Sequence, residues 1–197
     1  VASPPLRVHR ALGSGPDVPY RNRYIRPPLR GAGEVMSMQD LKVEIDFDHF
    51  PPEYTCDGEG ISPRIRITGS GAPYLAIIID DPDASKGTFT HWVAWNIPST
   101  EEIPPGIPPE PRISHPVSIV QGMNDSRKTG YTGPCPSKGV HRYFIRVWGV
   151  ERELDLPPGA ERVELTDALA SAATGYGEAM ATYGREKVLK SPPATRT

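Results

Sequence analysis

Two histidines, an acidic turn and a loop rich in glycine and proline are the residues of this chain that could do chemistry. Asp81 and Asp83 follow a strongly apolar run, and His91 lies in the next apolar run. Much later, His141 follows a Gly-Pro-Cys-Pro loop. Imidazole N–H groups and exposed loop amides donate hydrogen bonds to phosphate and carboxylate oxygens. The two segments therefore predict strand ends that meet around one small, anion-binding polar pocket.

Each of these residues also has a purely structural interpretation. Proline between two aspartates makes a tight turn by fixing φ and accepting backbone N–H bonds. Either histidine alone is an ordinary core or edge residue. In the functional interpretation, Asp81 or Asp83 holds an imidazole in one tautomer. The tyrosine hydroxyls of residues 131, 143 and 183 are further candidate donors, and Trp92 and Trp95 are core aromatics or a pocket wall.

Catalysis and metal binding are weaker interpretations of the same residues. An Asp–His pair can act as a general base, but Cys135 is the only plausible nucleophile nearby. The sequence has no Gly-x-Ser-x-Gly elbow, and its histidines, cysteines and aspartates do not stand at familiar metal-ligand spacings. We therefore predict a ligand-binding protein, not an enzyme, with no catalytic residues, no metal and no cofactor.

The two cysteines, Cys56 and Cys135, are too few for a disulfide scaffold or a four-cysteine zinc site. Both lie in polar loops that should border the pocket, so we expect them close in space. Two independent free thiols are the preferred interpretation. The alternative is a disulfide that closes a loop of about 80 residues.

Composition narrows the class of protein. The chain has 197 residues and a formal net charge of −2, so no general attraction to nucleic acid or membranes is expected. No apolar run approaches the roughly 20 residues of a membrane-spanning helix, and the N-terminus lacks the apolar core of a secretory signal. We expect a cytoplasmic protein without an integral membrane segment.

The chain divides near residue 38. Residues 1–37 are rich in proline and glycine, contain six arginines and show no strand or helix period. They predict a flexible or irregular basic extension that contributes little to stability. Because the sequence begins with Val1 while Met36 and Met38 precede the first strand pattern, a start site assigned too far upstream is a second interpretation. Residues 38–197 form the predicted domain.

The domain is predicted to be mainly β. Strands are expected at residues 41–47, 64–68, 74–80, 89–97, 117–120 and 141–150, from alternation or continuous apolar runs. Helices are expected only near the end, at 164–173 with Thr166 as N-cap, and at 178–189. The fold class is α+β, mainly β: a sandwich-like antiparallel or mixed β-core with peripheral C-terminal helices.

Several ordered motifs resemble the phosphatidylethanolamine-binding protein family, which includes Raf kinase inhibitor protein. The likeness is to its bacterial and archaeal branch and runs from about residue 39 to 187. The motifs are Tyr54-Thr-Cys-Asp-Gly58, Asp81-Pro-Asp-Ala-Ser85, His91-Trp with Asn96-Ile-Pro98, Gly122-Met-Asn-Asp125, Gly130-Tyr-Thr-Gly-Pro-Cys-Pro136 and Gly139-Val-His-Arg-Tyr143. Ser85 stands where the family often has proline, and Cys135 where animal members tend to have glycine.

The resemblance implies a β-sandwich with a surface pocket for phosphate-like or phospholipid head groups. Its partners would include a kinase or a serine protease, because some members inhibit these enzymes. The leading function is a regulator that binds a small anion. The alternative is a serine-protease inhibitor that acts through the stiff, proline-rich loop of residues 101–116. By matching motifs, the pocket residues are Asp81, Asp83, His91, Gly133, Pro134, Cys135, Pro136, His141 and Tyr143.

Overall fold

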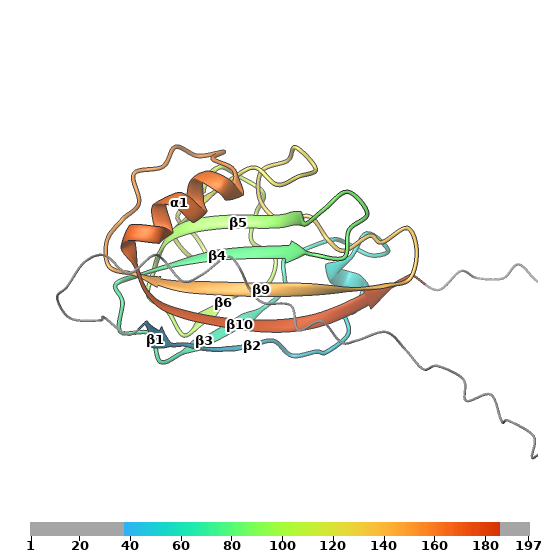
Figure 1. Cartoon of the computed structure of the whole chain (residues 1–197), viewed down its shortest axis with the longest axis horizontal. Coiled ribbons are helices and arrows are strands. Elements are labelled where there is room, and N and C mark those ends of the chain that lie inside the picture. The colour runs from blue at the N-terminus through green and yellow to red at the C-terminus, as the bar shows by residue number, and fades with distance from the viewer. Residues whose placement is uncertain (1–37, 186–197) are drawn as a thin grey trace, which may run out of the picture.

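The computed structural model describes residues 38–185 and shows a large sheet of seven strands (Figure 1). Neighbouring strands are antiparallel except for the first pair, β1 and β10, which run parallel. In spatial order the strands are β1 (Gln39–Asp40), β10 (Ala173–Gly184), β9 (Val140–Val150), β4 (Tyr74–Asp81), β5 (Phe89–Pro98), β8 (Ile119–Gln121) and β7 (Arg112–Ile113).

A second, three-stranded sheet covers one face of the large sheet. It consists of β2 (Lys42–Glu44), β3 (Ile65–Thr68) and β6 (Glu102–Ile103). Val43, Ile65 and Ile67 of this sheet share one core cluster with Ile77 and Ile145 of the large sheet. The predicted β-sandwich is therefore confirmed.

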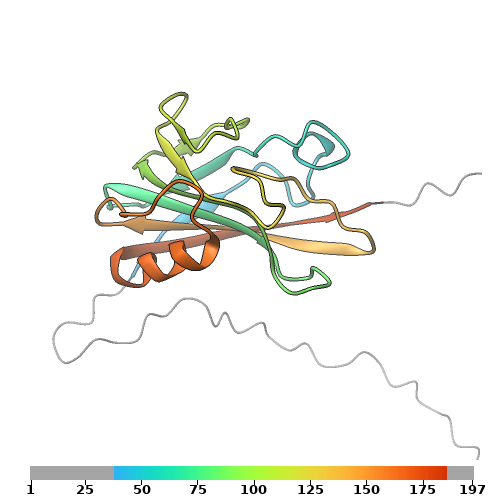
Figure 2. The same cartoon turned by 90° about the horizontal axis from the view of Figure 1, so that it is seen from above.

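The opposite face of the large sheet is covered by α1 (Arg162–Ala172), as Figure 2 shows from above. Leu165 and Leu169 of this helix pack with Ile78, Trp95 and Trp148 in a second core cluster. Strand β4 lies between the two clusters and is buried on both faces, which explains its continuous apolar run. Alternate residues of β4 thus pack into different core clusters.

Each of the six predicted strands overlaps an observed strand, but the prediction of a second helix at residues 178–189 is wrong. Residues up to 184 belong to β10, and the part beyond 185 lies outside the described residues. The backbone of Leu41 crosses β10 so closely that a Cβ on Gly177 would come within 2.2 Å of the Leu41 carbonyl oxygen. The alanines and glycines of this segment resemble a helical pattern, but in the structure the glycines permit the close crossing of a strand.

The first predicted helix exists with a different start. It begins at Arg162, and the Glu161 backbone N–H donates to the Glu164 side chain over 2.8 Å. Thr166, expected as the N-cap, lies inside the helix, where its hydroxyl donates to the Arg162 carbonyl. No helix within residues 38–185 is long and apolar enough to cross a membrane. The predicted extension, residues 1–37, lies outside the described residues, so that expectation stays a prediction.

A buried ion-pair network fastens α1 to the sheet. Asp80, near the end of β4, binds the guanidinium of Arg146 on β9 and lies 3.4 Å from that of Arg162 on α1. The side chains of Asp80 and Arg146 are only 5% and 7% exposed. Burial raises the pKa of Asp80, and the two arginines oppose that shift. Such groups are tolerated in the interior because they are paired.

We expect Arg146→Ala to lower the free energy of unfolding by about 3–5 kcal/mol, because it leaves the buried Asp80 carboxylate without its main partner. The control is Arg127→Ala, which removes an exposed ion pair with Glu161 and should cost at most about 1 kcal/mol. Urea denaturation measures both. Equal losses in the two variants would contradict the role of the network.

Candidate functional site

The site is built on the end of β4. Asp81, 4% exposed, turns its side chain away from the face used by Asp80. Its Oδ1 accepts the backbone N–H of Asp83 over 2.8 Å, which closes the expected tight turn. Its Oδ2 lies 2.7 Å from Nδ1 of His141 at the start of β9. One oxygen of this aspartate therefore closes the turn, and the other contacts the imidazole of His141.

The carboxylate fixes the tautomer of His141. A carboxylate oxygen is an acceptor, so Nδ1 carries the hydrogen and Nε2 points away from Asp81. The His141 side chain is 17% exposed. Within the described residues, its Nε2 has no hydrogen-bond partner.

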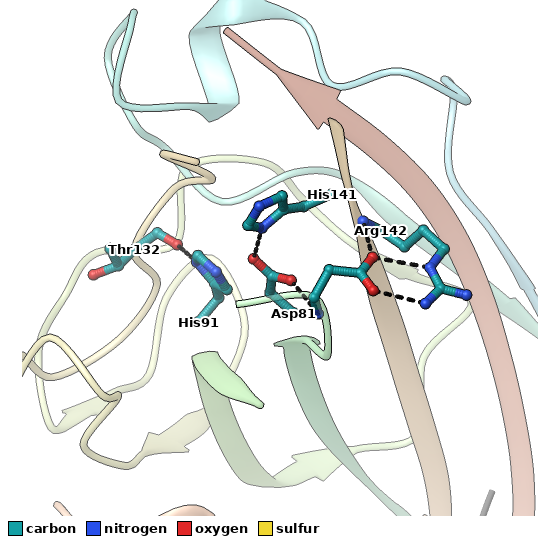
Figure 3. A network of polar contacts seen from close by, with 6 residues as sticks. Asp81, His91, Thr132, His141 and Arg142 are labelled. Carbon is teal, nitrogen blue, oxygen red and sulfur yellow. Dashed lines mark hydrogen bonds and ion pairs between the residues drawn. The ribbon is translucent and has the colours of Figure 1, made fainter. Parts of the chain in front are cut away.

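Asp83 has a different task from Asp81. Its carboxylate accepts the backbone N–H and Nε of Arg142 at 2.9 Å each, and Nη2 at 2.7 Å (Figure 3). These hydrogen bonds with Arg142 lower the pKa of Asp83, and burial partly opposes them. The pair joins the turn after β4 to the start of β9, and so holds His141 beside Asp81.

His91 enters the same site from β5. Its Nδ1 lies 2.7 Å from the backbone oxygen of Thr132, and its ring packs edge-on to Tyr143 at 5.3 Å. Figure 3 shows the rings of His91 and His141 beside the Asp81 carboxylate. Burial lowers the pKa of His91, although the Thr132 carbonyl and the charge of Asp81 oppose that shift. His91 is therefore neutral near pH 7.

The loop that carries Thr132 is shaped by Asn124, which is buried. The Asn124 amide donates to the Gly130 carbonyl and to Thr132 Oγ1, both at 2.9 Å. The Thr132 backbone N–H also donates to the His91 carbonyl. Sequence reasoning missed Asn124 and Thr132 as site residues, although Asn124 lies in one of the quoted motifs. Thr132 contacts His91 through its backbone oxygen. Every residue type has this atom, so the sequence could not identify the position.

The Gly-Pro-Cys-Pro loop is joined to the loop around η1 (Pro52–Tyr54). Cys56 and Cys135 form a disulfide, with their Cα atoms 5.4 Å apart. Cys56 N–H donates to the Pro134 carbonyl, and a Cβ on Gly133 would come within 2.6 Å of the Tyr54 oxygen. The predicted closeness is confirmed, and the preferred interpretation of two free thiols is wrong. The chain-entropy model gives a bond of this span about 4 kcal/mol.

The three tyrosines expected as hydroxyl donors are mostly engaged elsewhere. Tyr131 donates to the Tyr54 carbonyl over 2.7 Å, and Tyr183 donates to Asp57 over 2.7 Å. The ring of Tyr143 lies edge-on to His91 and is stacked with His141, and its hydroxyl is buried without a hydrogen-bond partner in the described residues. Burial and the charge of Asp81 raise the pKa of Tyr143 far above its ordinary value, so it stays neutral.

The structure gives the remaining candidates no hydrogen bond to His91 or His141 within residues 38–185. Pro134 and Pro136 are buried, and Cys135 is exposed. Trp92 and Trp95 belong to the two different core clusters, which supports their interpretation as core aromatics. Across residues 38–185, no group of three or more histidine, cysteine, aspartate or glutamate side chains is placed to hold a metal ion.

The protein is a mainly β sandwich in which two histidines meet near the ends of the central strands. The sequence model of the phosphatidylethanolamine-binding protein family matches residues 42–184, and the chain belongs to this family. UPF0098 protein PYRAB11530 of Pyrococcus abyssi is 46% identical over 189 residues, which cover 92% of this chain and 97% of the relative.

Two further comparisons agree with this assignment. UPF0098 protein PH1269 of Pyrococcus horikoshii is 44% identical over 162 residues, covering 80% of this chain and 82% of the relative. The crystal structure of Escherichia coli YbcL, described as a member of the mammalian PEBP family, superposes with a TM-score of 0.67 at 22% identity. That match covers 76% of this chain and all of YbcL (100%), and it supports the fold.

The Asp83–Arg142 pair predicts a pH-dependent contribution to stability. The pKa of Asp83 is lowered in the folded protein. The stabilisation is therefore present above the pKa of Asp83 in the unfolded chain, about 3.9, and is lost as the pH falls through its pKa in the folded protein. Asp83→Asn should therefore lower the free energy of unfolding by about 1–2 kcal/mol at pH 7 and by progressively less below pH 4.

Urea denaturation at a series of pH values measures this difference. The control is Asp155→Asn, because Asp155 is exposed. A difference between wild type and Asp83→Asn that stays constant down to pH 2.5 would contradict the assignment.

Proposed function

We propose that the protein binds a small oxyanion, such as a phosphate-like head group, at His91 and His141, and that it thereby regulates a partner protein. One observation carries the proposal. Two imidazoles from the separate strands β5 and β9 are each fixed at Nδ1, and within the described residues neither Nε2 has a partner. Groups fixed in this way lose little conformational freedom when a ligand binds.

A binding role, and not catalysis, is favoured by the state of Cys135. This residue was the only plausible nucleophile near the histidines, and its sulfur is bonded to Cys56. A thiolate is required for nucleophilic attack, so the disulfide removes that chemistry. The proposal therefore assigns the histidines to ligand binding, with Asp81 as the group that orients His141.

The first test is His141→Ala, which removes the ring that Asp81 orients. We expect the amide shifts caused by inorganic phosphate or phosphoethanolamine in NMR spectra to disappear, while the spectrum of the folded protein is retained. The control is His115→Ala, since His115 is exposed on the loop of residues 101–116. Unchanged shifts in His141→Ala at saturating ligand would reject the site.

Serine-protease inhibition is the second candidate, and the bracing of the proline-rich loop favours it. The buried Gln121 side chain donates to the Pro108 and Glu110 carbonyls, both at 2.7 Å, while Pro109, Glu110 and Pro111 are exposed. A stiff exposed segment of this kind enters a protease cleft at low entropic cost.

Incubation with chymotrypsin-like and elastase-like enzymes tests this second function. An inhibitor that uses the loop should act stoichiometrically, and His141→Ala should inhibit as well as wild type because His141 lies on β9, outside the loop. Absence of inhibition would exclude these two enzyme classes as partners and leave the binding function.

A further inference from the structure

The disulfide between Cys56 and Cys135 lies at the surface of the molecule, because both residues are exposed. A reductant opens a disulfide when its thiolate attacks one of the two sulfurs, so the reaction requires access to a sulfur. This bond can therefore be attacked while the domain is folded. A disulfide buried in the core could be attacked only after local unfolding.

The loop on one side of the disulfide is anchored independently of the bond. Thr55 precedes Cys56, and its hydroxyl donates to the Pro52 carbonyl over 2.9 Å. Asp57 follows Cys56, and its carboxylate accepts the hydroxyl of Tyr183 on β10 over 2.7 Å. These hydrogen bonds do not involve the sulfur atoms. The loop that carries Cys56 therefore keeps its position on β10 when the disulfide is opened.

The segment on the other side, residues 135–139, has few anchors of its own. Pro134, just before it, accepts the backbone N–H of Cys56 over 3.1 Å. Within the described part of the chain, no hydrogen bond or ion pair involves residues 135–139 themselves, and only Pro136 among them is buried. Apart from the packing of Pro136, the disulfide is thus what ties this segment to the molecule before β9 begins at Val140.

Residues 135–139 lie between two residues of the site. Before them, the Thr132 carbonyl oxygen contacts His91. After them, His141 contacts the Asp81 carboxylate. Because Thr132 and His141 each have a partner of their own, both imidazoles stay in place while the chain between them gains freedom. Opening the disulfide therefore changes the loop beside the site and leaves the two histidines where they are.

We propose that the Cys56–Cys135 disulfide is a redox-sensitive modification site, which a dithiol reductant opens while the domain stays folded, and which controls the order of residues 135–139. This inference goes beyond the proposed function and does not depend on which ligand the site binds.

The exchange is an ordinary thiol–disulfide reaction. A thiolate of the dithiol attacks one sulfur and forms a mixed disulfide, and the other cysteine leaves as a thiolate. The second thiol of the dithiol then attacks the mixed disulfide, closes a disulfide within the reductant and releases the remaining cysteine. Two electrons and two protons pass from the dithiol to the two cysteines, and residues 135–139 lose their covalent tie.

Reduction of the full chain with dithiothreitol in native buffer, followed by alkylation with iodoacetamide, tests the access to the bond. We expect mass spectrometry to find one alkyl group on each cysteine, while circular dichroism retains the spectrum of the folded protein. Alkylation that occurs only in urea would overturn the inference, because the bond would then be closed to reductants in the folded state. Loss of the folded spectrum on reduction would also overturn it, because the bond would then support the whole domain.

Backbone ¹⁵N relaxation of the oxidised and reduced protein measures the effect on the loop. For Ser137, Lys138 and Gly139 we expect order parameters of about 0.85 in the oxidised state and below about 0.6 in the reduced state. The amides of Thr132 and His141 should keep their order parameters in both states, since each residue has its own partner at the site. Order parameters of residues 137–139 that do not change on reduction would overturn the inference.

The matched control is the double variant Cys56→Ser with Cys135→Ser, which cannot form the bond. Its order parameters at residues 137–139 should be low both with and without dithiothreitol. A rise or fall on addition of dithiothreitol to this variant would show that the reagent acts elsewhere and would overturn the assignment to the disulfide. The comparison of oxidised and reduced wild type remains decisive where the double variant does not fold.

Discussion

The end of strand β4 is the point on which the rest of the structure depends. Adjacent residues of a strand face opposite sides, so Asp80 enters the network beneath α1 while Asp81 enters the site. Both carboxylates meet residues of β9, in a register that pairs Asp80 with Phe144. A slip of one residue would exchange the two carboxylates between the faces. The apolar residues on both sides of β4, which fix this register, therefore also fix the position of His141.

Strong periodicity explains what the sequence could predict. The strands that became β4, β5 and β9 carry long apolar or alternating patterns, and their ends bring Asp81, His91 and His141 together. The sequence could not decide which aspartate orients an imidazole. The decision depends on direction: Asp81 ends the strand and faces His141, whereas Asp83 lies beyond the turn and reaches Arg142.

What the sequence could not predict depends on partners far along the chain. The alanines and glycines of β10 have no strong strand pattern, and Gly177 is required only because Leu41 crosses it. The state of His91 is set by the Thr132 backbone oxygen, which any residue type could supply. The sequence predicted that Cys56 and Cys135 lie close in space, but whether their sulfurs are bonded depends on the exact geometry of the two loops, which their local sequences do not specify.

The disulfide also determines whether the chain stays in one piece after its backbone is cleaved. Cys56 and Cys135 are 79 residues apart, and the interval between them contains β4, β5 and the exposed proline-rich loop, while β9 lies outside it. A single cut in that loop would separate His91 from His141 along the backbone. The two fragments would nevertheless remain covalently linked, with an imidazole in each, until a reductant broke the disulfide. A protease that cleaved the loop would thus leave His91 and His141 in one covalently linked molecule.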